Sequence, residues 1–200
     1  LVSCQRGFMG FSTAQKLDNL GICDPNTCEL VFEACEVPED NVLGTLNWAV
    51  EVLMNGLDYE RVVLDDGPLG IMQACWDLVL PYVHQRKQFG QPIGEFQLIQ
   101  GKLADMALAV DASALLVYRA AWTKDVKADR VTREASMAKL LASEAATQNA
   151  LDAIQIHGGY GFATEYEVGR LLLEAKTLEV GEGTSELHRK LIAEFALGIR

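Results

Sequence analysis

The chain has 200 residues, half of them hydrophobic, and its 17 basic and 28 acidic side chains give a net charge of -11. This length can bury one good core, and the acidic excess argues against nucleic acid as a partner. No apolar stretch is long enough to span a bilayer, and the first residues, LVSCQRGFMG, lack the apolar region of a secretory signal. We therefore expect a globular protein of an interior compartment.

Cysteine and histidine offer little for a disulfide scaffold or a metal site. None of the five cysteines forms a CxxC pair, and their odd number leaves at least one thiol free. The three histidines, His84, His157 and His188, lie far from the cysteines in sequence. We predict free thiols and no structural metal.

Residues 1–43 predict the end of a β-sheet domain. In CELVFEACEV, residues 28–37, apolar and charged residues partly alternate, with Leu30 and Phe32 on one face. VPEDN then supplies a proline and acidic turn residues. Because one or two strands do not form a stable sheet alone, either further strands precede this segment or it packs on helices.

Residues 44–200 predict a bundle of helices. One apolar stripe has spacings of three, four or seven and consists of Ile99, Leu103, Met106, Val110, Val117 and Ala121. Residues 131–156 are rich in alanine, which lets a neighbouring helix approach closely, and Thr132 is the expected N-cap. Glycines of HGGYGF end that helix, and shorter helices follow at about 165–176 and 184–198. The fold class is therefore mainly α, a bundle attached to part of a β domain.

Two loop stretches contain residues suited to a ligand. RKQFGQPIGEFQLIQ, residues 86–100, puts Arg86 beside a glycine turn, and a guanidinium pairs with phosphate oxygens in bidentate fashion, although many surface arginines have no such role. QIHGGYGF, residues 155–162, has two adjacent glycines where backbone can approach a ligand closely. It does not match GxGxxG after a strand, and a helix stop explains it equally well.

Two further stretches contain carboxylates. GLDYERVVL places Asp58, Glu60 and Arg61 in an apolar helix, which is typical of a solvated face, but Glu60 adjoins residues expected to be buried, and burial raises a carboxyl pKa. VGEGTSELHR holds Glu182 between two glycines, directly before a Thr-Ser pair. This is either helix capping or a carboxylate presented where a ligand approaches the backbone.

In this order and at these separations, the chain resembles the C-terminal half of an acyl-CoA dehydrogenase. The stretches that carry the resemblance are NTCELVFEACEVPEDNVLG, GLDYERVVL, GPLGIMQA, RKQFGQPIGEFQLIQGKLADM, AIQIHGGYGF and VGEGTSELHR. GLDYERVVL, GPLGIMQA and QRKQFGQPIGEFQ are most similar to the isovaleryl-CoA branch, whereas RAAW and EASMAKLLASEAAT are closer to the short-chain butyryl branch. The resemblance implies the last strands of the middle β domain, then the C-terminal four-helix bundle.

The resemblance also implies an activity. Such an oxidoreductase dehydrogenates a short or branched-chain acyl-CoA, isovaleryl- or butyryl-like, to the 2-enoyl-CoA. A glutamate removes the α-proton, hydride passes to N5 of FAD, and electrons pass to an electron-transfer flavoprotein. Because FAD is shared between subunits, a homodimer or homotetramer is implied, and the expected location is the mitochondrial matrix or the bacterial cytoplasm.

By the same resemblance, residues can be assigned to each ligand. The FAD contacts are Arg86, Phe89 and Gln97, of which Arg86 and Gln97 face the FAD of a neighbouring subunit, then Gln155, Ile156, His157, Gly158 and Gly159, and finally Thr184, Ser185 and Glu186. The residues along the acyl-CoA are Asp58, Tyr59, Arg61 and Gly183.

Family members place the catalytic base at one of two positions, and this chain has glutamate at both. Most use the position of Glu182, whereas the isovaleryl-CoA branch uses that of Glu60 and has a small residue at the other. Two carboxylates aimed at one α-carbon do not easily both ionise, so one holds a proton or turns away. We favour Glu182 as the base, since its glycines allow close approach, with Glu60 as an ion-pair partner of Arg61 or a second acid.

Two departures from the family pattern favour other interpretations. LLLEAK, residues 171–176, lacks the usual arginine, with Leu173 and Glu174 in that region, while Asp65 and Asp66 replace small residues and would be costly in a core unless solvated. A non-catalytic or truncated oligomerisation module is the main alternative. An acyl-CoA oxidase-like flavoenzyme is another, and it would release peroxide in air.

We expect the 200-residue chain alone to bind FAD poorly. Family members carry an N-terminal helical domain and most of the β domain, which close the acyl pocket and hold the flavin. The purified chain should therefore be colourless, and its absorption spectrum should show no flavin bands. Stoichiometric yellow colour would contradict this expectation.

Overall fold

The computed structural model describes residues 1–22, 27–126 and 130–199. It divides into two compact units, Leu1–Leu57 and Asp58–Arg200. The predicted boundary between residues 43 and 44 stays a prediction. Among the described helices, none has both the length and the apolar character that crossing a membrane requires.

The first unit is built on an antiparallel pair of strands, β1 (Phe11–Leu17) and β2 (Thr27–Phe32). Phe11 pairs with Phe32, and their rings stack with centroids 5.1 Å apart. A short 3-10 helix, η1 (Glu39–Asn41), and the start of α1 (Ala49–Leu64) follow. The predicted strand is present, and the two residues predicted to share a face, Leu30 and Phe32, are each 54% exposed.

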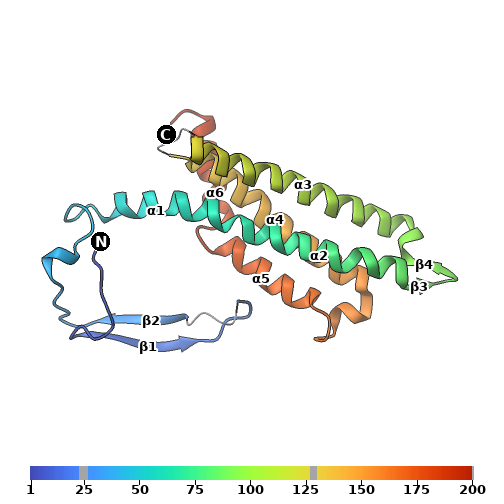
Figure 1. The fold of residues 1–200 in the computed structure, drawn as a ribbon, viewed down its shortest axis with the longest axis horizontal. Helices are drawn as coiled ribbons and strands as arrows, with labels where there is room; N and C mark the ends of the chain where they lie inside the picture. The colour runs from blue at the N-terminus through green and yellow to red at the C-terminus, as the bar shows by residue number, and fades with distance from the viewer. Residues whose placement is uncertain (23–26, 127–129, 200) are drawn as a thin grey trace. The chain divides into compact units, whose positions relative to one another are not determined.

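The second unit is the predicted helical bundle. Its long helices run lengthwise, and a small hairpin lies at one end between consecutive helices (Figure 1). The elements are α2 (Asp66–Gln85), β3 (Lys87–Gln88), β4 (Gln91–Pro92), η2 (Ile93–Glu95), α3 (Gln97–Val126), α4 (Thr132–His157), η3 (Gly158–Phe162), α5 (Val168–Val180) and α6 (Ser185–Ala196).

Helix α4 is the central helix of this unit, since it contacts α2, α3, α5 and α6. Its alanines make this possible, because small side chains let neighbouring helices approach closely. The fully buried ones are Ala135, Ala138, Ala142, Ala146, Ala150 and Ala153. The predicted stripe of α3 also faces the core, with Met106 and Val117 buried.

The ends of α4 confirm one prediction and correct another. The helix ends at His157, and its C-cap Gly158 has φ +61°, as the glycine pattern indicated. Thr132, the expected N-cap, is instead the first helical residue; its hydroxyl is buried and donates to Oδ2 of Asp58. Capping was the wrong interpretation because a carboxylate from α1 competes for that hydroxyl.

Cys4, Cys28, Cys35 and Cys75 are free thiols, as predicted, and Cys23 lies outside the described residues. In the described ranges, no group of three or more His, Cys, Asp or Glu side chains is placed to hold a metal ion.

Candidate functional site

The loop between α5 and α6 presents Glu182 on a strained backbone. Glu182 has φ +56° and Gly183 has φ +107°. A left-handed conformation costs an ordinary L-residue roughly 1–2 kcal/mol and persists only where the surroundings impose it. Capping is performed two residues after Glu182, by Thr184, whose hydroxyl accepts from the N–H of Leu187 at 3.4 Å. Capping therefore does not explain Glu182, and its conformation points to a function.

Gly183 cannot be replaced without moving its neighbours. A Cβ at this position would lie 3.0 Å from a methyl carbon of Leu187, 3.2 Å from Nε2 of His188 and 3.4 Å from a guanidinium nitrogen of Arg61. Its φ is also one that L side chains rarely adopt. Packing as well as backbone conformation therefore requires glycine directly after Glu182.

Arg61 holds this loop from α1. Its side chain is buried, and Nε donates to the carbonyl oxygen of Glu182 at 3.0 Å. One guanidinium nitrogen lies 3.9 Å from the carboxylate of Asp58, which is itself buried. Of the other residues predicted to lie along the acyl-CoA, Tyr59 is exposed and Gly183 lies in the loop. Asp58 and Arg61 thus have clear structural partners, whereas Tyr59 remains open to a ligand.

The structure brings the two candidate bases together across the sequence. Partial burial raises the pKa of Glu182, and the nearby Glu60 carboxyl raises it further, while Arg61 and Lys139 act in the opposite direction. Glu60 is exposed, which agrees with the interpretation of its stretch as a solvated face, and its neighbours Arg61 and Val62 are buried. The buried face of α1 contains Asp58, Arg61 and Val62, and helical geometry turns Glu60 away from it.

Sequence reasoning missed Lys139, which supports the same loop. It lies on α4 and is 1% exposed, and its Nζ donates to the carbonyl oxygens of Gly183 at 2.6 Å and Glu179 at 3.1 Å. The available signal is a single lysine on a buried helical face formed mainly by small residues such as Ala135, Ser136 and Ala142.

Two further titratable groups are buried behind the loop. Asp65 is 1% exposed, and burial, opposed by Lys139, raises its pKa to about 8. His188 is fully buried, and burial, with the positive charges of Lys139 and Arg61, lowers its pKa to about 4. The imidazole is therefore neutral at pH 7. Asp66, in contrast, is exposed at the start of α2, so only one of the two predicted costly aspartates lies in the core.

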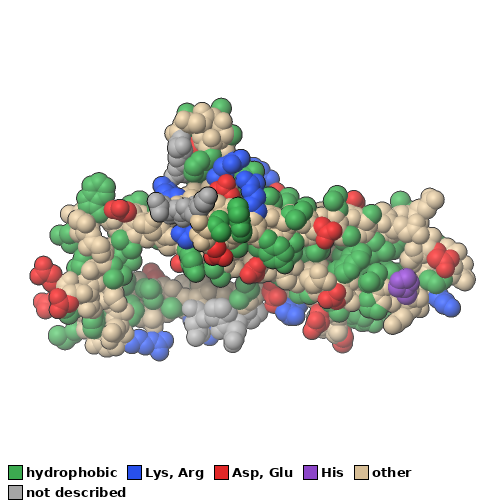
Figure 2. All heavy atoms as spheres, turned by 45° about the horizontal axis from the view of Figure 1, so that its top comes forward, with side chains coloured by type: hydrophobic (Ala, Val, Ile, Leu, Met, Phe, Trp, Pro, Cys, Tyr) green, Lys and Arg blue, Asp and Glu red, His purple; other side chains and the backbone are tan. Residues whose placement is uncertain are grey.

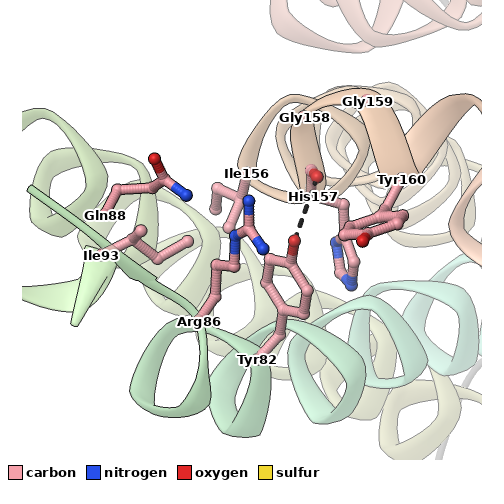
Figure 3. Close-up of a pocket in the computed structure, with 9 residues that line it drawn as sticks. All are labelled: Tyr82, Arg86, Gln88, Ile93, Ile156, His157, Gly158, Gly159 and Tyr160. Atoms are coloured by element: carbon pink, nitrogen blue, oxygen red, sulfur yellow. Dashed lines mark hydrogen bonds between the residues drawn. The ribbon is translucent and has the colours of Figure 1, made fainter.

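A cavity of about 480 Å³ lies at the hairpin end of the bundle (Figure 3). Its lining comes from the end of α2, strand β3, the start of η2 and the α4–η3 junction: Tyr82, Arg86, Gln88, Ile93, Ile156, His157, Gly158, Gly159 and Tyr160. The hydroxyl of Tyr82 donates to the carbonyl oxygen of His157 at 3.2 Å, and their rings stack at 4.2 Å. The guanidinium of Arg86 lies 5.6 Å from the ring centre of Tyr160. This arrangement offers a phosphate one arginine and exposed glycine backbone.

The predicted cofactor residues fall into two groups in space. Arg86 and residues 156–159 line the cavity, while Gln97 and Gln155 are exposed outside its lining and Phe89 is 92% exposed at the hairpin. Residues 184–186 begin α6, at the opposite end of the bundle (Figure 1). One chain therefore presents two separate candidate surfaces.

Comparison with known proteins identifies the family. Residues 50–197 match the model of the acyl-CoA dehydrogenase C-terminal domain, and the chain therefore belongs to the acyl-CoA dehydrogenase family. It is 55% identical over 188 residues to the mitochondrial isovaleryl-CoA dehydrogenase of Solanum tuberosum, covering 94% of this chain and 45% of that protein. It is 58% identical over 184 residues to the mitochondrial 2-methylacyl-CoA dehydrogenase of the same organism, covering 92% and 44%.

A solved structure supports the fold. The FAD complex of PigA superposes with a TM-score of 0.92 at 28% identity, over 98% of this chain and 51% of that one. The helical bundle expected from the sequence is confirmed. The chain spans about half the length of the relatives that it matches.

Proposed function

We propose that this chain forms the C-terminal part of an FAD-dependent enzyme that converts a short or branched-chain acyl-CoA, isovaleryl- or butyryl-like, into its 2-enoyl-CoA. The observation that carries the proposal is Glu182, a carboxylate on left-handed backbone between two glycines, with a raised pKa. The names of the relatives, isovaleryl-CoA and 2-methylacyl-CoA dehydrogenase, support a short branched substrate.

Glu182 is proposed to remove the proton on the carbon next to the thioester. That carbon is a weak acid until its carbonyl oxygen is polarised by hydrogen bonds, and a carboxylate with a raised pKa is a stronger base. We assign the N–H of Glu182 as one donor to the carbonyl oxygen, since the glycines on either side leave the backbone accessible. The chemistry that FAD supplies when bound is acceptance of the β-hydrogen as hydride.

The residues present fit an FAD contact at both candidate surfaces. At the cavity, Arg86 is exposed, and an added Cβ at Gly158 or Gly159 would meet nothing within 4 Å, so the backbone there is open to a ligand. At the start of α6, Ser185 is buried, and its Oγ has no hydrogen-bond partner among the described residues. An orphaned hydroxyl of this kind suits a cofactor oxygen or nitrogen.

The separation of these surfaces supports a cofactor shared between subunits. A ligand touching both surfaces of one chain would run along much of α2, which has 20 residues and is about 30 Å long. We therefore propose that Arg86 and Gln97 contact the FAD of a neighbouring subunit in a homodimer or homotetramer.

An apolar stripe on α3 also supports self-association. Leu108, Leu115, Tyr118 and Trp122 recur on one face of the helix and are between 63% and 71% exposed. Hydrophobic side chains reach the surface of the helical unit between scattered acidic ones (Figure 2). An exposed patch of this kind is typical of a protein interface.

Substitution of Arg86 tests the cavity. In the full-length enzyme, Arg86→Met is expected to weaken FAD binding by roughly 10- to 100-fold, the usual effect of losing a charge-assisted hydrogen bond. Flavin fluorescence titration of the apoenzyme measures this. The control is Arg119→Met, which removes an arginine of α3 that pairs with Glu134 rather than lining the cavity. Equal FAD affinity in both variants would contradict the assignment.

Anaerobic bleaching of the flavin by isovaleryl-CoA or butyryl-CoA tests the proposed activity. Bleaching without peroxide release in air, and with reoxidation by an electron-transfer flavoprotein, supports the dehydrogenase. The non-catalytic module remains the second candidate, favoured by the carboxylate of Asp65 in the core. It predicts a full-length oligomer that stays colourless.

The mitochondrial names of the relatives support the matrix as the location, with the bacterial cytoplasm as the alternative.

A further inference from the structure

Lys139 is a charged side chain in the middle of an alanine-lined interface. It is the largest fully buried side chain of the described residues, and burying an ammonium group is costly unless it is hydrogen-bonded. Its Nζ finds two acceptors, the carbonyl oxygens of Glu179 and Gly183. Both belong to the end of α5 or the loop that follows, so the ammonium is directed at the backbone around Glu182.

The position of these acceptors favours a cation. Glu179 lies in the last turn of α5, where carbonyl groups lack helical partners and carry the negative end of the helix dipole. Arg61 reaches the next part of the loop and donates to the carbonyl oxygen of Glu182. Two buried cations from different helices thus hold three carbonyls within residues 179–183.

This clamp acts on the strained part of the chain. Glu182 and Gly183 both have positive φ, and a strained backbone persists only when its surroundings hold it there. Glu179 precedes Glu182 by three residues and Gly183 follows it directly, so Lys139 holds the backbone on both sides of the carboxylate. Lys139 therefore adds to the hydrogen bond from Arg61 and the packing around Gly183, which act on the same loop.

We propose that Lys139 is a positioning residue, whose ammonium fixes the left-handed loop so that the carboxylate and N–H of Glu182 face the acyl thioester. This inference rests on the proposed role of Glu182. Lys139 holds the loop and does not itself touch the substrate.

The charged groups around Lys139 determine how its loss affects Glu182. Asp65 faces it from the junction of α1 and α2, Arg61 from α1, Glu179 and Glu182 from α5 and the loop, and His188 from α6. Burial lowers the pKa of Lys139, and the three carboxyls oppose this. In return, the positive charge of Lys139 lowers the pKa of Glu182, so removing it should make Glu182 harder to ionise.

The test compares Lys139→Met with wild type in the full-length FAD-loaded enzyme. Amide hydrogen exchange in peptides covering residues 180–185 should become faster. Flavin reduction by isovaleryl-CoA should slow by roughly 10- to 100-fold, as small misplacements of a catalytic group do. The acid limb of its pH profile should move to higher pH, a change that loss of packing alone would not cause.

Lys102→Met is the matched control. It removes an ammonium paired with Asp152, between α3 and α4, and leaves the loop carbonyls bonded. It should keep wild-type loop exchange and the wild-type acid limb. If Lys139→Met fails to fold, Lys139→Gln keeps amide donors without the charge; it should shift the acid limb in the same direction while disturbing loop exchange less.

Two results would overturn the positioning role. One is unchanged loop exchange and acid limb in both Lys139 variants; the other is equal changes in Lys102→Met. If Glu182 is not the base, Glu182→Gln will retain its rate of flavin reduction. Amide exchange of the loop tests the role of Lys139 independently, because it does not depend on which residue is the base.

Discussion

Glu182→Gln in the full-length FAD-loaded enzyme is expected to slow flavin reduction by acyl-CoA by about 10²- to 10⁴-fold, the usual contribution of a positioned base. Glutamine keeps the shape and the backbone N–H but cannot accept the proton. Glu60→Gln is the matched control, since it removes the neighbouring carboxylate from an exposed position on α1, and it is expected to retain most of the rate.

The pH profile should separate the two residues further. The base acts in its ionised form, so the rate is lost as pH falls through its pKa. Glu60 raises the pKa of Glu182 above its ordinary value of 4.5. Removing that negative charge should therefore lower the pKa, and the acid limb of Glu60→Gln should move to lower pH.

Anaerobic stopped-flow measurement of flavin absorbance across a pH series checks both expectations. Equal activity of the two variants would overturn a single base. A large loss confined to Glu60→Gln would place the base on α1, as in the isovaleryl-CoA branch that the sequence resembles.

Asp65→Ala is expected to stabilise the protein, and by more at pH 8 than at pH 5. The carboxyl is buried, and neither of its oxygens has a hydrogen-bond partner among the described residues. Burial outweighs the attraction of Lys139 and Arg61 and raises the pKa from 3.8 to about 8. Between these values the folded state holds a proton that the unfolded state has released, so wild-type stability falls as pH rises.

The expected gain follows from this linkage. Each unit of pKa difference between the folded and unfolded states changes the free energy of unfolding by about 1.4 kcal/mol. The free energy of unfolding of Asp65→Ala relative to wild type should therefore grow by roughly 2–4 kcal/mol between pH 5 and pH 8. Denaturant unfolding of the purified protein at several pH values measures it. Asp66→Ala is the control, because Asp66 is exposed at the start of α2, where a negative charge favours the helix. A gain independent of pH would show that Asp65 is ionised in the folded state.

Periodicity and glycine positions made most of the fold predictable. The α3 stripe faces the core at Met106 and Val117, and Gly158 ends α4 where the pattern indicated. Thr132 was assigned wrongly because capping preferences are local, whereas its partner Asp58 lies 74 residues earlier in the chain. Local rules cannot account for a competitor that only folding brings into contact.

The sequence alone determined that Glu182 lies between glycines before a helix and that a second carboxylate, Glu60, accompanies it in an acyl-CoA dehydrogenase pattern. Only the tertiary structure decided that Glu60 is exposed, that Asp65 is buried, and that Lys139 and Arg61 hold the loop of Glu182. The physical reason is that burial and hydrogen bonds of charged groups depend on which helices pack together, and these contacts join residues 44 and 121 positions apart.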